Sequence, residues 1–416
     1  MNRHMFTALI VFTLIWWGPG LLAPHRFDTA HMITFILVGC LWLAWKLGQR
    51  EKWLGWTYTA LIIGTGVNLF TNRTVLLKGM RDGAVRADIT LVPLLGCLSI
   101  GAAVCIFLWA ANLSASDSRF LAKSIAFVGA ISGVLGIIQL YSGDFMGIYG
   151  VNPVKDVGAS VGLWGNPGLQ GITLALTLPL ALFALPWASI PIMAGLVASK
   201  SVIGFLAAAT ATVYYLSLIK IWWVILILAV AFTVFLKIED PQSFRHLDRL
   251  RVWKATAWLW PRYPTGRFLG DKSLPVSAIS STFGWGLGMF KKRFPIWDYR
   301  SFRIGLIREE GPPDKDRTRT GENTTVTGRP WHHPHNEFLS LLFEGGPAAI
   351  LPFLVFVFGL LLPIKKHKDT RGEARAFGAC LIAGLVSALW HFPFHFAPSA
   401  VILSIAASRL SVGETR

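Results

Sequence analysis

The residues best suited to chemistry lie where a long polar segment runs directly into an apolar stretch. His335 and Asn336 stand at the mouth of the predicted helix, and Glu337 and Glu344 lie inside it. The spacing of the two glutamates places them on roughly one helix face. A carboxylate in hydrocarbon is costly unless it is paired or faces a polar cavity, so that face is expected to point toward protein or water. Histidine accepts a proton near neutral pH, and we predict His335 as a general base.

The elements that must position these residues are membrane helices. The chain has 416 residues, is 53% hydrophobic and 15% charged, and apolar runs of about 18 residues or more recur along it. The 18 tryptophans fit many membrane–water interfaces. A formal charge of +17 suits loop orientation and attraction of anionic head groups or phosphates. We expect no nucleic-acid partner, because no soluble basic domain is present, and we expect the four cysteines to be buried thiols within apolar runs.

The pattern predicts an all-α polytopic membrane protein with about twelve spans. Spans 1–9 occupy residues 1–237, a long extracytoplasmic segment with surface helices occupies 238–337, and spans 10–12 with a cytoplasmic C-terminus occupy 338–416. The individual spans are expected near 5–23, 28–46, 53–71, 89–111, 120–141, 168–186, 187–199, 201–218, 221–237, 338–363, 376–392 and 394–410. A segment of roughly a hundred residues far exceeds ordinary loop length and is expected to carry function.

Lysine and arginine in the short loops predict the orientation. The basic loops at 46–52 and 365–375 both fall on the cytoplasmic side if the N-terminus is inside. The loop at 72–88 is also basic yet would be external, and we give the two loops more weight than the one. The loop at 142–167, the turn at 199–201 and the long segment then emerge on the same external face, where a site is expected.

Four blocks of sequence resemble the O-antigen ligase/polymerase superfamily of bacterial envelope glycosyltransferases. They are Gly-Leu-Trp-Gly-Asn-Pro-Gly at 162–168, Arg-x-x-x-Trp at 249–253, Gly-x-Gly-x-Gly-x-Phe at 284–290, and His-Asn followed by Glu-x-Gly at 335–346. The resemblance covers about residues 150–410. Three positions depart from the family's pattern. Lys200 stands where arginine is usual and loses the bidentate fork for phosphate, Gly168 replaces an asparagine, and Ala349 stands where a third glycine is common.

The resemblance implies a GT-C-like enzyme at the periplasmic face of the bacterial inner membrane that uses no cofactor and no metal. It would move a glycan from undecaprenyl diphosphate to a lipid A–core sugar hydroxyl, with inversion. His335 would be the base, and Arg249, Arg251 and Lys200 would bind the departing pyrophosphate. Six further residues would shape the site: Asn336, Glu344, Asn166, Gly284, Gly286 and Gly288.

Each residue also has a structural explanation. His335 could cap the following helix, Arg249 and Arg251 could be interfacial arginines, and Lys200 could be a plain turn residue. Glu344 reads more readily as the partner of a cation than as a catalyst. The three glycines fit a phosphate-approaching loop or a tight turn equally.

The remaining motif residues have less specific readings. Asn166 with Pro167 is expected to cap the next helix, whether or not it also belongs to the site. His391 and His395 are expected to flank a helix break near the external face, where they would pack or line a cavity. A zinc site built from them and from His332, His333 and His335 is disfavoured, because no acidic partner is suitably spaced.

The motifs leave the acceptor open. The same lipid-linked donor would serve an O-antigen or exopolysaccharide polymerase, with a growing glycan as acceptor, or a protein O-oligosaccharyltransferase. A transporter or flippase for a polyanionic lipid would also need external cations. That class predicts inverted repeats, and residues 1–208 and 209–416 show no self-similarity.

Overall fold

The computed structural model describes part of the chain, and its regular elements there are all helical. The residues described are 103, 105–142, 159–216, 253, 256, 336–366, 372–391, 393 and 396–412. Across these residues no strand occurs, which confirms the predicted helical class for this part of the protein. They belong to two compact units, one with 103–216 and 356–412 and the other with 253, 256 and 336–355.

The described helices correspond closely to the predicted spans. They are α6 (Ala115–Ser142), α8 (Pro167–Ala184), the 3-10 turn η3 (Pro186–Ala188), α9 (Ser189–Ser199), α10 (Val202–Tyr215), α15 (Glu337–Lys366), α16 (Gly372–Ala388) and α17 (Ala397–Val412). The span expected at 89–111 is helical at 103 and 105–111, where it is described. The spans expected at 5–23, 28–46, 53–71 and 221–237 lie outside the described residues.

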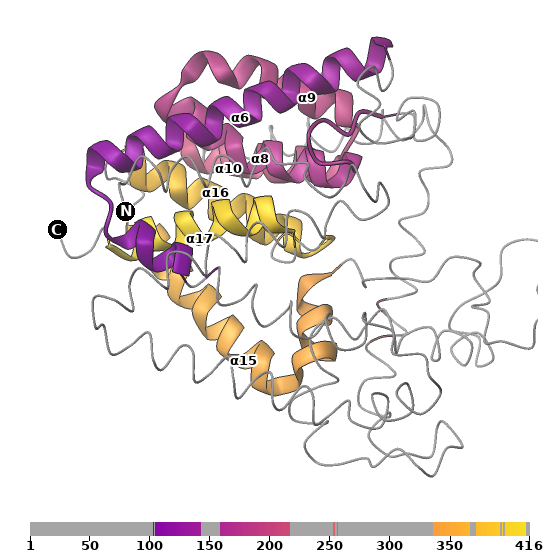
Figure 1. Ribbon diagram of the computed structural model, residues 1–416. Helices are drawn as coiled ribbons and strands as arrows, with labels where there is room; N and C mark the ends of the chain where they lie inside the picture. Colours follow the sequence, from indigo (N-terminus) through magenta and orange to yellow (C-terminus); the bar gives the residue numbers. More distant parts are fainter. Residues whose placement is uncertain are drawn as a thin grey trace, which may run out of the picture. The chain divides into compact units, whose positions relative to one another are not determined.

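In the first unit, α8 is the central helix. It packs against α6, α9, α10, α16 and α17, as Figure 1 shows for the magenta and yellow helices. Most of its side chains are buried, and its only polar members after the first turn are threonines whose hydroxyls bond to backbone or to another buried hydroxyl. A helix that is apolar on every side is one that other helices or lipid must surround.

Two of the described helices, α6 and α8, are long and apolar enough to cross a membrane, and η3 with α9, α10 and most of α17 form shorter apolar helices. Large apolar side chains on α6 and α9 remain exposed, and the rings of Phe127 and Trp187 meet edge to face at 6.4 Å between centroids. The other exposed members are Phe120, Val134, Ile138, Tyr141, Ile190, Met193 and Val197. Such a surface fits contact with lipid better than contact with water.

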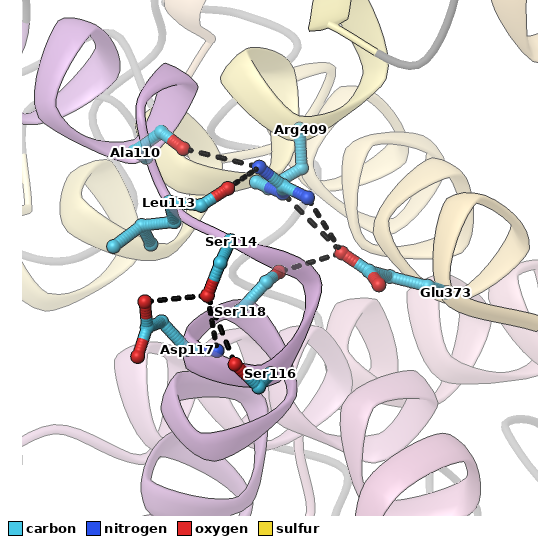
Figure 2. A network of polar contacts seen from close by, with 8 residues as sticks. All are labelled: Ala110, Leu113, Ser114, Ser116, Asp117, Ser118, Glu373 and Arg409. Carbon is cyan, nitrogen blue, oxygen red and sulfur yellow. Dashed lines mark hydrogen bonds and ion pairs between the residues drawn. The ribbon is translucent and has the colours of Figure 1, made fainter. Parts of the chain in front are cut away.

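One end of the first unit is held by an ion pair (Figure 2). The guanidinium of Arg409, in the last turn of α17, lies 3.0 Å from the carboxylate of Glu373, in the first turn of α16. Ser118 of α6 donates to the same carboxylate oxygen at 2.6 Å. Arg409 also donates to the carbonyl oxygens of Ala110 and Leu113, where the helical stretch at 105–111 ends. The pair therefore joins three helices and satisfies carbonyls that a helix end leaves open.

The predicted span at 338–363 is corrected in one respect, because α15 is not a single straight helix. Gly346 has φ 61° and ψ −166°, a conformation essentially restricted to glycine, and two helices meet there (Figure 1). Pro347 follows and lacks the N–H that a continuous helix would need, which suits it to the start of the second helix.

The cysteines that are described agree with the prediction of buried thiols. Cys105 and Cys380 are free and buried. The Sγ of Cys380 donates to the carbonyl of Leu176 at 3.0 Å, so it serves the contact between α16 and α8. Cys40 and Cys97 lie outside the described residues.

Candidate functional site

The segment before α8 is positioned by the asparagine that the sequence singled out. Asn166 is the N-cap of α8, and its side-chain oxygen accepts hydrogen bonds from the N–H groups of Gly168 and Leu169 at 2.8 and 3.3 Å. Pro167 occupies the first helical position, as predicted. The carbonyl of the Asn166 side chain serves the helix, and its NH2 group, on an exposed residue, retains donors suited to an anion.

Side chains of α6 and α8 hold the loop at 159–165 that precedes this cap. The Oε1 of Gln139 accepts from the N–H groups of Val161 and Gly162 at 3.1 and 2.8 Å, and its Nε2 donates to the carbonyl of Gly162 at 3.2 Å. The next N–H, of Leu163, donates to the hydroxyl of Ser132 at 3.1 Å. Consecutive amides of the loop are thus bound by two helix side chains.

Gln170 of α8 also contributes to holding the loop, because it binds Ser132. It accepts from the hydroxyl of Ser132 at 2.8 Å and donates to the Ser132 carbonyl at 3.1 Å. Gly162 has φ 51°, and a Cβ at that position would overlap the amide of Gln170. Glycine at 162 is therefore required both by the backbone conformation and by the available space.

The turn between α9 and α10 is the second element of the site. Lys200 ends α9 in the left-handed conformation, with φ 48° and ψ 23°, and its side chain is exposed. Ser201 caps α10 by accepting from the N–H of Gly204 at 3.2 Å. The predicted turn is confirmed. The left-handed backbone at a lysine is unusual, because glycine is the residue that adopts it at no cost.

The two elements lie side by side. The N–H of Ser160 donates to the carbonyl oxygen of Ala198 at 2.9 Å. One turn into α8, a Cβ on Gly171 would overlap Ser201, and a Cβ on Gly204 would meet the backbone of Gly171 at 2.6 Å. The loop at 159–167 and the turn at 199–201 therefore meet at the first turn of α8, at the end of the unit opposite Arg409. Lys200 and Asn166 are both exposed at this end of the unit, and an ammonium group and amide donors are groups that bind phosphate.

His391 lies at the same end and is buried. It follows α16, and its N–H bonds back to the carbonyl of Ser387 at 2.8 Å. A Cβ on Gly168 would lie 2.8 Å from its Nε2 and 3.1 Å from the Oδ1 of Asn166. Gly168, the departure from the family's asparagine, therefore leaves room for this imidazole. The prediction of packing at a helix break is confirmed for His391, since α16 ends at Ala388 and α17 begins at Ala397.

In the second unit, Asn336 caps α15. Its Oδ1 accepts from the N–H of Leu339 at 3.0 Å, and its carbonyl accepts from the N–H of Ser340 at 2.9 Å. Asn336 therefore occupies the N-cap position of α15, and the alternative reading of His335 as a capping residue falls on a residue outside the described ones. Asn336 is 9% exposed and Glu337 only 1% exposed, so a carboxylate is buried in the first turn of α15, where the helix dipole favours negative charge.

Several predicted residues cannot be placed in this geometry. His335, Arg249, Arg251, Gly284, Gly286, Gly288, His332, His333 and His395 lie outside the described residues. For Glu344 the backbone is helical within α15, before the bend at Gly346, and only the backbone is described. In the described part of the chain, no group of three or more metal-ligating side chains occurs.

The polar residues that organise the loop were missed by the sequence reading. Gln139, Ser132 and Gln170 are at most 5% exposed, within helices otherwise made of apolar and small residues. The signal was present, because an amide side chain in a membrane-length apolar run needs partners inside the protein. Attention to glutamines within long apolar runs would have identified all but Ser132.

Neither a scan of the chain against protein-family models nor a search of curated proteins returned a match.

Proposed function

We propose that this chain is a glycosyltransferase of the O-antigen ligase/polymerase type, with about twelve spans and its site on the periplasmic side of the bacterial inner membrane. It transfers a glycan from undecaprenyl diphosphate to a sugar hydroxyl of lipid A–core. The observation that carries this proposal is the junction of the loop at 159–167 with the turn at 199–201. Two segments that the family resemblance assigns to the site, far apart in sequence, meet at one end of the bundle.

The chemistry follows from the residues assigned to it. The acceptor hydroxyl attacks the anomeric carbon as His335 takes its proton, and a new glycosidic C–O bond forms. The bond from the anomeric carbon to the diphosphate oxygen breaks, and undecaprenyl diphosphate leaves with the bonding electrons. The single displacement inverts the anomeric configuration.

Charge stabilisation is assigned to Lys200, Arg249 and Arg251. The leaving group carries the developing negative charge, and cations placed before the reaction stabilise it at no cost of reorganisation. Lys200 is exposed at the end of α9 and is free to extend toward a lipid head group. Asn166, one residue before α8, offers its side-chain NH2 group at the same end.

The burial pattern also supports a membrane setting. Described helices of membrane-crossing length and apolarity, with large apolar side chains exposed on α6 and α9, fit a polytopic protein surrounded by lipid. A lipid-linked donor would reach such a protein within the bilayer, with its diphosphate at the interface.

The decisive experiment supplies the purified full-length protein with an undecaprenyl-diphosphate-linked glycan and, separately, with lipid A–core, with free glycan or with a serine-containing acceptor protein. Transfer of the glycan to lipid A–core would support the assignment as a ligase. Growth of the free glycan would make the protein a polymerase, and modification of the protein would make it an O-oligosaccharyltransferase. Absence of transfer, together with movement of the lipid between leaflets, would replace the enzyme by a transporter.

A further inference from the structure

We infer that Gln139, Ser132 and Gln170, called here the Gln139 cluster, are positioning residues for the lipid diphosphate, holding the loop at 159–165 against the Lys200 turn. The inference rests on the proposed function and extends it to residues that no motif contains. Exposed at most 5%, these side chains act through the loop rather than on the substrate.

The loop depends on this cluster for its backbone hydrogen bonds. The N–H groups of Val161, Gly162 and Leu163 all donate to side chains of α6, and the Gly162 carbonyl accepts from one of them. Buried amides left without partners cost free energy that a loop cannot recover from water. With Gln139 removed, the loop has to move to satisfy these groups.

The cluster itself is held rigidly. Ser132 both accepts from Leu163 and donates to Gln170, and Gln170 donates back to the Ser132 carbonyl. The side chain of Gln170 fills the space next to Gly162, so the loop cannot move toward α8. The cluster therefore fixes the loop from the side of α6 and from the side of α8.

Displacement of the loop would affect both described residues of the proposed phosphate site, one at each end of the loop. Ser160, before the bound amides, is hydrogen-bonded to Ala198 at the end of α9, two residues before Lys200. Asn166, after them, caps α8. Loss of Gln139 should consequently change the positions of Lys200 and Asn166 relative to the bound diphosphate, although neither residue is substituted.

The test uses the full-length protein in nanodiscs and compares Gln139→Leu with wild type. Two quantities are measured: hydrogen exchange of peptides covering 159–165, and the affinity for undecaprenyl diphosphate. We expect exchange at Val161 and Gly162 to become about tenfold faster or more, because two hydrogen bonds to the loop amides are lost. Affinity for undecaprenyl diphosphate should fall by about three- to tenfold.

Ser118→Ala is the matched control. It removes a partly buried hydrogen bond from the same helix, at the end that contacts Glu373. This variant should lose comparable stability while exchange at 159–165 and affinity for undecaprenyl diphosphate stay at the wild-type level. Ser132→Ala provides a milder second change in the cluster if Gln139→Leu fails to fold, and it should accelerate exchange at Leu163.

A double mutant separates positioning from general stability. If Gln139 acts by placing Lys200, the affinity losses of Gln139→Leu and Lys200→Ala should combine to less than their product. Full multiplicativity, or unchanged exchange at 159–165 in both cluster variants, would overturn the inference. If wild type neither binds undecaprenyl diphosphate nor transfers glycan, the proposed function fails and the positioning role fails with it, whatever the exchange of the loop shows.

Discussion

The backbone N–H of Ser160 donates to the carbonyl oxygen of Ala198 at 2.9 Å, and this bond joins the loop before α8 to the last turn of α9. One loop ends at Asn166 and the other turns at Lys200. Their contact places Asn166 and Lys200 at the same end of the first unit, and Asn166 lies at the N-terminus of α8, where an anion is favoured. Changes at either residue therefore test the same proposed site from two sides.

Lys200→Arg should strengthen binding of the lipid donor. Arginine keeps the positive charge and adds a planar fork that binds phosphate through two hydrogen bonds. We expect KM for the undecaprenyl-diphosphate-linked donor to fall by about threefold, with KM for the acceptor unchanged. Steady-state kinetics with each substrate varied in turn would measure this. An equal change in both constants would mean that Lys200 does not act on the donor.

Lys200→Gly and Lys200→Ala should separate the charge from the backbone. Both remove the cation and should weaken donor binding alike. Glycine also relieves the left-handed backbone at this position, so Lys200→Gly should be more stable than Lys200→Ala by about 1 kcal/mol. Thermal unfolding in detergent and donor binding would be measured in parallel. Restored donor binding in the glycine variant would show that the turn, not the charge, matters.

Asn166→Asp should preserve the helix and damage the site. Aspartate is as good an N-cap as asparagine, so the stability of α8 should be kept, whereas Asn166→Ala should cost about 1 kcal/mol. The added carboxylate would repel a diphosphate and remove the NH2 donors. We expect a stable protein with weakened donor binding, measured by thermal unfolding and by titration with undecaprenyl diphosphate. Unchanged binding in the aspartate variant would remove Asn166 from the site.

His335→Ala should abolish glycan transfer while folding and donor binding remain. The reason is that the acceptor hydroxyl loses its proton acceptor, and positioned acid–base help is worth about 10²–10⁴-fold in rate. Transfer would be followed with the lipid-linked glycan, and folding by thermal unfolding. Transfer at the wild-type rate would exclude His335 from the mechanism.

Chelation of divalent metals should leave transfer unchanged, because the proposed stabilisation of the diphosphate comes from lysine and arginine side chains. The rate would be measured before and after treatment with a strong chelator, followed by gel filtration. Strong inhibition that zinc or magnesium reverses would favour a metal site built from the histidines at 332–335 instead.

The pair of Arg409 and Glu373 should contribute to stability but not to catalysis. Its members come from α17 and α16 (Figure 2), and none of the residues that they contact belongs to the proposed site. Glu373→Gln should destabilise the protein by about 2 kcal/mol, as charge-assisted hydrogen bonds from Arg409 and Ser118 are weakened. A double-mutant cycle with Arg409→Gln should give a coupling energy of about 0.5–3 kcal/mol. Transfer measured well below the melting temperature should stay at the wild-type rate.

Apolar periodicity predicted the described helices well, because each needs a run of apolar residues long enough to be surrounded by other helices or by lipid. α8 was expected at 168–186 and lies at Pro167–Ala184, with its start fixed by the Asn166–Pro167 cap. α15 was less predictable. Gly345 and Gly346 lie inside an apolar run that was expected to form one helix, and the signal for the bend is Pro347, because a proline disfavours the helical conformation at the residue before it.

The candidate site was predictable only in its exposed and glycine-rich parts. Asn166 and Lys200 stood out because they interrupt apolar runs at turns. The residues that hold the loop did not stand out, because they belong to separate helices: Gln139 bonds to the backbone of the loop, whereas Gln170 bonds to Ser132 on α6. Which helix faces which is set by packing among several spans, and a single sequence does not encode it in any local pattern.

The bend at Gly346 limits how far the first part of α15 could extend into a bilayer. The helical leg from 337 to 345 rises 1.5 Å per residue and is about 14 Å long, less than half of a hydrocarbon layer of about 30 Å. In the proposed membrane setting, this leg can dip into one leaflet but cannot traverse both. With Asn336 at one membrane surface, the bend at Gly346 would lie within the same leaflet. A single glycine would thereby keep the start of α15 and the proposed site beside it in one half of the bilayer.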